Sequence, residues 1–122
     1  LGGAAFPDFD LDQWLDLAKR TMVVTQNGRI SFDYDMAIAE PFAKPGNAAP
    51  PNLWLAYEAL RGVPMLLVRG ELSDLLSPDT LKQMAVRNPA MQTVVVPRVG
   101  HAPTLDEPEV RAAIHALLDG VE

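Results

Sequence analysis

The feature that most constrains the fold is an alternation of apolar runs and helical patterns between residues 63 and 118. Strands are predicted at 63–69 and 92–96, around the unbroken apolar runs Met65-Leu-Leu-Val and Val94-Val-Val, and Pro78 and Pro108 each mark the start of the helical pattern that follows. Unbroken apolar runs are typical of strands that are buried on both faces of a parallel sheet. Proline is tolerated in the first helical turn because the N–H that it lacks has no partner there. The order strand, helix, strand, helix therefore predicts an α/β fold with helices packed on parallel strands.

The chain is long enough for one ordinary domain or a large piece of one, because 122 residues, 48% of them hydrophobic, can bury a sizeable core. A two-stranded parallel sheet is not stable by itself, since it leaves long unpaired edges and half a core. Some other sheet must complete it. The sequence also begins with Leu1 and not with Met, so we expect a processed or truncated product.

The first part of the chain follows a different pattern. Apolar residues recur at three- and four-residue intervals over 11–22, which predicts an amphipathic helix. The period then changes to two on either side of Asn27-Gly28, which predicts a β-hairpin closed by a type I′ turn. Prolines concentrated in 35–51 predict a connector, after which Asn52 is expected to cap a short helix.

An acid and a histidine each follow one of the predicted strands. Asp74 lies just beyond the first strand and His101 just beyond the second. Because sites in open α/β sheets collect at the carboxyl ends of the strands, we expect these side chains to lie close together. Histidine exchanges protons near neutral pH, and a carboxylate on its other ring nitrogen fixes the tautomer, so the pair makes two thirds of a catalytic triad. Glu71 is an alternative acid, whereas Asp79 is expected to favour a helix N-terminus.

Two segments resemble a known family. Val63-Pro-Met-Leu-Leu-Val-Arg-Gly-Glu-Leu-Ser-Asp-Leu-Leu-Ser-Pro78 resembles the late strand and acid-bearing turn of the α/β-hydrolases. Val96-Pro-Arg-Val-Gly-His-Ala-Pro-Thr-Leu-Asp-Glu-Pro108 resembles their last strand and histidine loop. The triad of that family runs in the order nucleophile, acid, histidine. The resemblance covers about residues 56–121 and implies that Asp74 is the triad acid and His101 the triad base.

The fold implied by this resemblance is the C-terminal part of an α/β-hydrolase fold. Residues 52–122 would form an αβαβα core of parallel strands with flanking helices, and residues 1–51 a preceding cap or linker segment with a helix, a hairpin and a proline-rich connector. The activity implied is hydrolysis of an ester or related bond in a small-molecule substrate.

The sequence departs from the family at the nucleophile. No Gly-x-Ser-x-Gly turn is present, and Ser31, Ser73 and Ser77 are expected to be structural. The nucleophile of the complete hydrolase is expected to be either a serine or an aspartate. We therefore expect that this chain supplies the histidine and the acid of a longer hydrolase and is inactive alone. Its expected partner is the N-terminal part of the same hydrolase or another copy of the chain. The alternative is a non-catalytic fragment or degenerate hydrolase module that folds by self-association and binds without turnover.

Composition argues against several other classes. A net charge of −6 argues against a nucleic-acid partner, and no apolar run approaches the roughly 20 residues of a membrane span. The absence of cysteine and of a signal-peptide pattern predicts a cytoplasmic protein. No cofactor or metal is expected, because no second histidine lies at ligand spacing from the acids near residue 107. His115, Trp14, Trp54 and Tyr57 are expected to be structural.

Overall fold

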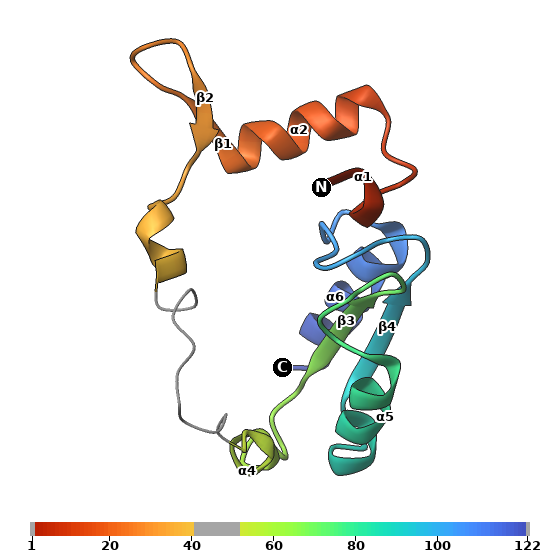
Figure 1. Ribbon diagram of the computed structural model, residues 1–122. Coiled ribbons are helices and arrows are strands. Elements are labelled where there is room, and N and C mark those ends of the chain that lie inside the picture. The colour runs from red at the N-terminus through yellow and green to blue at the C-terminus, as the bar shows by residue number, and fades with distance from the viewer. Residues whose placement is uncertain (1, 41–51, 122) are drawn as a thin grey trace. The chain divides into compact units, whose positions relative to one another are not determined.

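A computed structural model describes residues 2–40 and 52–121 (Figure 1). It divides the chain into two compact units. Leu1–Asp8 and Asn52–Glu122 form the unit that we call the sheet unit, and Phe9–Pro51 form the hairpin unit. The assignment of 1–51 to a cap or linker and of 52–122 to a hydrolase core stays a prediction. Most of the connector expected in 35–51 lies outside the described residues.

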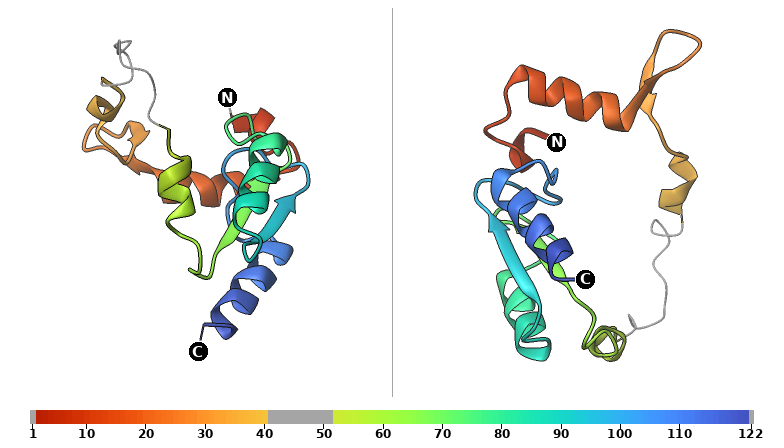
Figure 2. Two further views of the ribbon diagram at one scale, coloured as in Figure 1. Left: turned by 90° about the horizontal axis from the view of Figure 1, so that it is seen from below. Right: turned by 180° about the vertical axis from the view of Figure 1, so that it is seen from behind.

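The sheet unit is built on two parallel strands, as the sequence predicts. Strand β3 (Leu66–Gly70) pairs with β4 (Gln92–Val96), and the register runs from Leu66 opposite Gln92 to Gly70 opposite Val96. Parallel strands require a crossover connection, which here contains helix α5 (Pro78–Arg87). Helix α6 (Pro108–Asp119) follows β4 and packs against both strands. Figure 2 shows α5 and α6 on opposite faces of the strand pair.

Both helices begin where the prolines predict. Pro78 and Pro108 occupy the first turns of α5 and α6. The side chain of Ser77 caps α5 by accepting a hydrogen bond from the Thr80 N–H at 3.0 Å. The N-cap of the short helix α4 (Trp54–Glu58) is Leu53 and not Asn52, as the sequence had suggested, although the Asn52 side chain accepts from the Trp54 N–H at 3.1 Å.

The buried core of the sheet unit is small. Val96 and Val110 are 2% and 0% exposed, and Phe6, Met91 and Val99 are also buried. The expectation that both faces of the strands are buried is wrong for β4 in the described part of the chain. Side chains alternate between the faces of a strand, and on one face of β4 they stay exposed. In the described part of the sheet unit the sheet has two strands, so β3 and β4 each have one edge without a strand neighbour.

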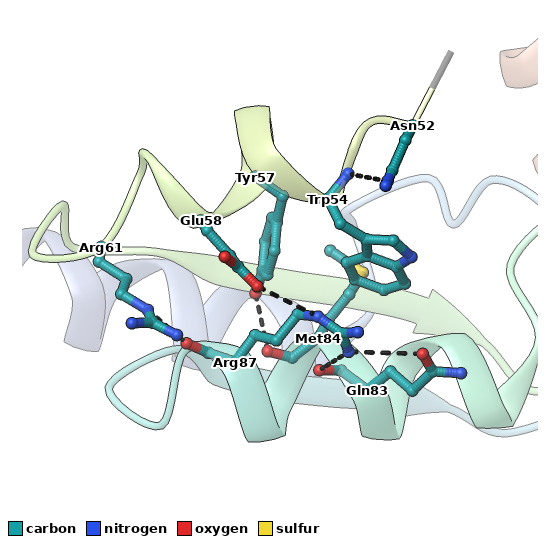
Figure 3. Close-up of polar contacts among 8 residues, drawn as sticks. All are labelled: Asn52, Trp54, Tyr57, Glu58, Arg61, Gln83, Met84 and Arg87. Atoms are coloured by element: carbon teal, nitrogen blue, oxygen red, sulfur yellow. Dashed lines mark hydrogen bonds and ion pairs between the residues drawn. The ribbon is translucent and has the colours of Figure 1, made fainter. Parts of the chain in front are cut away.

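Helix α4 is fixed to α5 by polar and aromatic contacts, drawn in Figure 3. The Tyr57 hydroxyl donates to the Met84 carbonyl at 3.0 Å. The Arg87 guanidinium lies 4.0 Å from the ring centroid of Trp54 and 3.4 Å from the Glu58 carboxylate. A cation over an indole face is attracted by the ring quadrupole. Trp54 and Tyr57 therefore join two helices.

The hairpin unit begins with the predicted amphipathic helix, α2 (Leu11–Thr21). Asp10 and Gln13 form a capping box, in which each side chain bonds the backbone N–H of the other. The hairpin follows directly: β1 (Met22–Val24) pairs antiparallel with β2 (Ile30–Phe32). A single 3-10 turn, η1 (Met36–Ala39), comes next.

The hairpin is confirmed, but its predicted type I′ turn is wrong. That turn needs positive φ at both Asn27 and Gly28, and only Gly28 has it, at 72°. Instead the Gly28 N–H closes a turn on the Thr25 carbonyl at 2.9 Å. One left-handed glycine after such a turn is the pattern of a longer hairpin loop. No helix in 2–40 or 52–121 is long and apolar enough to cross a membrane.

Candidate active site

Backbone hydrogen bonds join the segments that carry Asp74 and His101. We call residues 71–77 the acid turn and residues 97–107 the histidine loop. The Leu72 N–H donates to the Val99 carbonyl at 2.9 Å, which connects the turn to the loop. Just before it, the Glu71 N–H donates to the Val96 carbonyl at 2.8 Å and extends the β3–β4 ladder. The two segments therefore lie side by side at the carboxyl edge of the sheet, as the sequence predicts.

Two glycines permit close approaches of the backbone, Gly70 to the histidine loop and Gly100 to α1. A Cβ atom at Gly70 would overlap the backbone of Val99 and Gly100. A Cβ atom at Gly100 would lie 2.7 Å from Cα of Ala5. The Gly100 N–H uses this proximity to donate to the Ala5 carbonyl. Helix α1 (Gly2–Ala5) thus ends against the histidine loop, within the sheet unit.

Arg98 also ties the histidine loop to neighbouring segments. Its guanidinium makes two hydrogen bonds to the Asp8 carboxylate, and Nη2 lies 2.6 Å from Oδ1. These bonds hold the pKa of Asp8 below its ordinary value and raise that of Arg98. The Arg98 N–H donates to a carboxylate oxygen of Glu71 at 2.8 Å. Glu71, the alternative acid, thus bonds the loop backbone, and Asp79 pairs with Lys82 in the first turn of α5.

The structure brings Ser73 to the ring of His101. Ser73 Oγ lies 3.4 Å from His101 Nδ1, a long hydrogen bond whose donor depends on the ring tautomer. The same hydroxyl accepts from the Leu76 N–H at 3.1 Å. Asp74 is the next residue in the turn and is exposed, as is His101. Among residues 2–40 and 52–121, no hydrogen bond joins the Asp74 carboxylate to His101.

The contact of Ser73 with the ring was missed in the sequence. Its only signal is that Ser73 precedes the candidate acid, which does not separate a histidine contact from an ordinary turn serine. Ser77 caps α5, and His115 is exposed on α6. No described residue set of three or more His, Asp or Glu side chains could hold a metal ion. The described site therefore places an imidazole beside a hydroxyl, with an exposed carboxylate on the residue after that serine.

Comparison with known proteins identifies relatives that are hydrolases. No family model matches the chain. It is 36% identical over 115 residues to a 3-hydroxybutyrate-oligomer hydrolase of Cupriavidus necator, covering 86% of this chain and 38% of that protein. A crystal structure of an α/β hydrolase from Novosphingobium aromaticivorans matches with a TM-score of 0.87 and 53% identity, over 98% of this chain and 42% of that one.

A second solved structure supports the fold. The E-2-(acetamidomethylene)succinate hydrolase matches with a TM-score of 0.67 and 24% identity, over 96% of this chain and 42% of that one. The chain therefore spans about two fifths of the length of each protein that it matches. The resemblance and the fold class inferred from the sequence are both confirmed. Over nearly its whole length the chain is similar to α/β-hydrolases, and its sheet and helices correspond to the C-terminal part of the α/β-hydrolase fold.

Proposed function

We propose that His101 and Asp74 are the base and the acid of a catalytic triad that hydrolyses an ester or related bond. The observation that carries this proposal is the backbone bond from Leu72 to Val99, which holds the acid turn against the histidine loop. Both side chains are exposed at this edge, so a substrate and a nucleophile could reach them. The order of acid before histidine agrees with the order in the family.

The direction of the His101 ring suits a general base. Its Nδ1 faces the acid turn, at 3.4 Å from Ser73, so Nε2 is the nitrogen available to a nucleophile. In a triad, Nε2 takes the proton of the nucleophile and later returns it to the leaving group, while a carboxylate bonds Nδ1–H. Catalytic hydrogen bonds are often long before the substrate binds. We expect the Asp74 carboxylate to reach Nδ1 in the reacting complex.

The nucleophile is proposed to come from outside this chain. Ser73 and Ser77 lie between β3 and α5, but neither is in a Gly-x-Ser-x-Gly turn, and without a nucleophile and an oxyanion hole the base has no substrate carbonyl to act on. We propose that the N-terminal part of the same hydrolase, or another copy of the chain, completes both the site and the sheet. The isolated 122-residue chain is therefore expected to leave p-nitrophenyl esters intact and to resist a fluorophosphonate probe.

The substrate class to test first follows from a relative. The Cupriavidus protein is described as a hydrolase of 3-hydroxybutyrate oligomers, which are joined by ester bonds. We propose that the complete gene product cleaves small esters of this kind. The assay is kcat and KM on 3-hydroxybutyrate oligomers and on p-nitrophenyl esters.

Single variants of the complete gene product test the assigned roles. Asp74→Asn is expected to lower kcat by about ten-thousandfold and His101→Ala by about ten-thousandfold to a millionfold, the losses that follow removal of a triad acid and a triad base. The matched controls are His115→Ala on α6 and Asp79→Asn on α5, which are expected to leave kcat unchanged. Full activity in His101→Ala would contradict the proposed function.

A further inference from the structure

Arg69 is a buried cation behind the acid turn. It is the fourth residue of β3 and only 6% exposed. Its Nε donates to the Leu76 carbonyl at 2.6 Å, and its Nη2 lies 3.4 Å from the Ser73 carbonyl. No carboxylate of residues 2–40 or 52–121 forms an ion pair with it. Burying an ionised group is costly unless its donors are used, and here the recorded partners are two carbonyls of one turn.

The Ser73 carbonyl belongs to the peptide group that leads into Asp74. Arg69 therefore contacts the turn immediately before the candidate acid and again two residues after it, at Leu76. The turn is closed from within as well. The Ser73 N–H donates to the Gly70 carbonyl at 3.0 Å, and the Ser73 hydroxyl accepts from the Leu76 N–H at 3.1 Å. The backbone on both sides of Asp74 is thus held, whereas its carboxylate is exposed.

We propose that Arg69 is a positioning residue, which sets the place of Asp74 and of the Ser73 hydroxyl relative to His101. This inference rests on the proposed function. The planar guanidinium presents donors in a fixed fork, so it can hold two carbonyls at a set separation. Lysine carries the same charge as a single compact group and cannot reproduce the fork. Because small displacements of a catalytic group cost rate, Arg69 acts on catalysis without touching the substrate.

The test compares Arg69→Lys with Arg61→Met. Arg61 also donates from Nε to a backbone carbonyl, that of Arg87 at 2.9 Å, but it is exposed and joins the turn after α4 to α5 (Figure 3). Two measurements are made. Amide hydrogen exchange at Leu76 is followed by NMR in the 122-residue chain, and kcat and KM are measured in the complete gene product.

The expected result is specific to the acid turn. Arg69→Lys speeds exchange at Leu76 by about tenfold or more and lowers kcat by roughly tenfold to a hundredfold, the range for leaving buried acceptors unpaired. KM stays close to the wild-type value, and exchange at Gln92, which bonds Met65 at the far end of the ladder, does not change. Arg61→Met changes none of these quantities. A merely structural role would lower thermal stability and leave kcat per folded molecule intact.

Two outcomes would overturn the inference. One is that Arg69→Lys has the same kcat as wild type although Asp74→Asn has lost activity, because Asp74 would then work without being held in place by Arg69. If Asp74→Asn is itself fully active, the proposed function has failed. Amide exchange at Leu76 then decides by itself whether Arg69 holds the acid turn. Faster exchange in Arg69→Lys would then support a bond between Arg69 and the turn, and unchanged exchange would exclude it.

Discussion

Replacing Gly70 by alanine is expected to destabilise the sheet unit by about 2–5 kcal/mol. The added Cβ would lie within 2.8 Å of the Val99 carbonyl carbon and closer still to the carbonyl oxygens of Val99 and Gly100. These are backbone atoms, so no side-chain rotation relieves the overlap. Overpacking of this kind costs about 1–3 kcal/mol. Moving the loop also weakens the bonds from Glu71 and Leu72, each worth roughly 1 kcal/mol.

The matched control is Gly120→Ala. A Cβ there would meet the carbonyls of Ala116 and Leu117 at 3.5 and 3.6 Å, which is ordinary contact. Urea unfolding of both variants measures the difference, and faster amide exchange at Leu72 reports the local separation. The reasoning is refuted if Gly70→Ala stays within about 0.5 kcal/mol of wild type, the usual range of a surface substitution. Equal destabilisation by Gly120→Ala would refute it as well.

Two further predictions concern the packing of the sheet unit. Val110→Ala removes a side chain that is 0% exposed and is expected to cost about 2 kcal/mol in urea unfolding, and a neutral result would contradict the assigned core. The pKa of Asp8 is lowered by hydrogen bonds from Arg98, so the pair stabilises the fold above the ordinary carboxyl pKa and loses this effect as pH falls through the lowered pKa. In Asp8→Asn, the melting temperature is expected to fall less steeply as the pH is lowered. If the melting temperature depends on pH as it does in wild type, the Asp8–Arg98 pair is not the source of that dependence.

The sequence predicts the sheet unit well because its signals are local. Apolar runs and first-turn prolines identify β3, α5, β4 and α6, whose boundaries in the structure begin at Leu66, Pro78, Gln92 and Pro108. The placement of Asp74 and His101 at the same edge of the sheet was also predictable from the sequence, since parallel strands bring their carboxyl ends together.

The details of the site were less predictable, because they depend on contacts between distant residues. In the sequence, Arg69 is a charged residue that interrupts an apolar strand. The neighbouring residues do not indicate that its guanidinium turns inward and donates to the Leu76 carbonyl. The contact of Ser73 with His101 joins residues 28 apart. The Arg98 bond to Asp8 joins residues 90 apart. The type I′ turn was wrong because Asn27-Gly28 permits positive φ at both residues but does not require it.

The most direct test of the central claim, that Asp74 and His101 work as one catalytic pair, is a double-mutant cycle in the complete gene product. It compares kcat/KM of Asp74→Asn, His101→Ala and the double variant with wild type. If the residues act as a unit, the double variant loses about as much activity as His101→Ala alone, because the acid works only through the histidine. Losses that multiply, with the double variant far below either single variant, would contradict the pair.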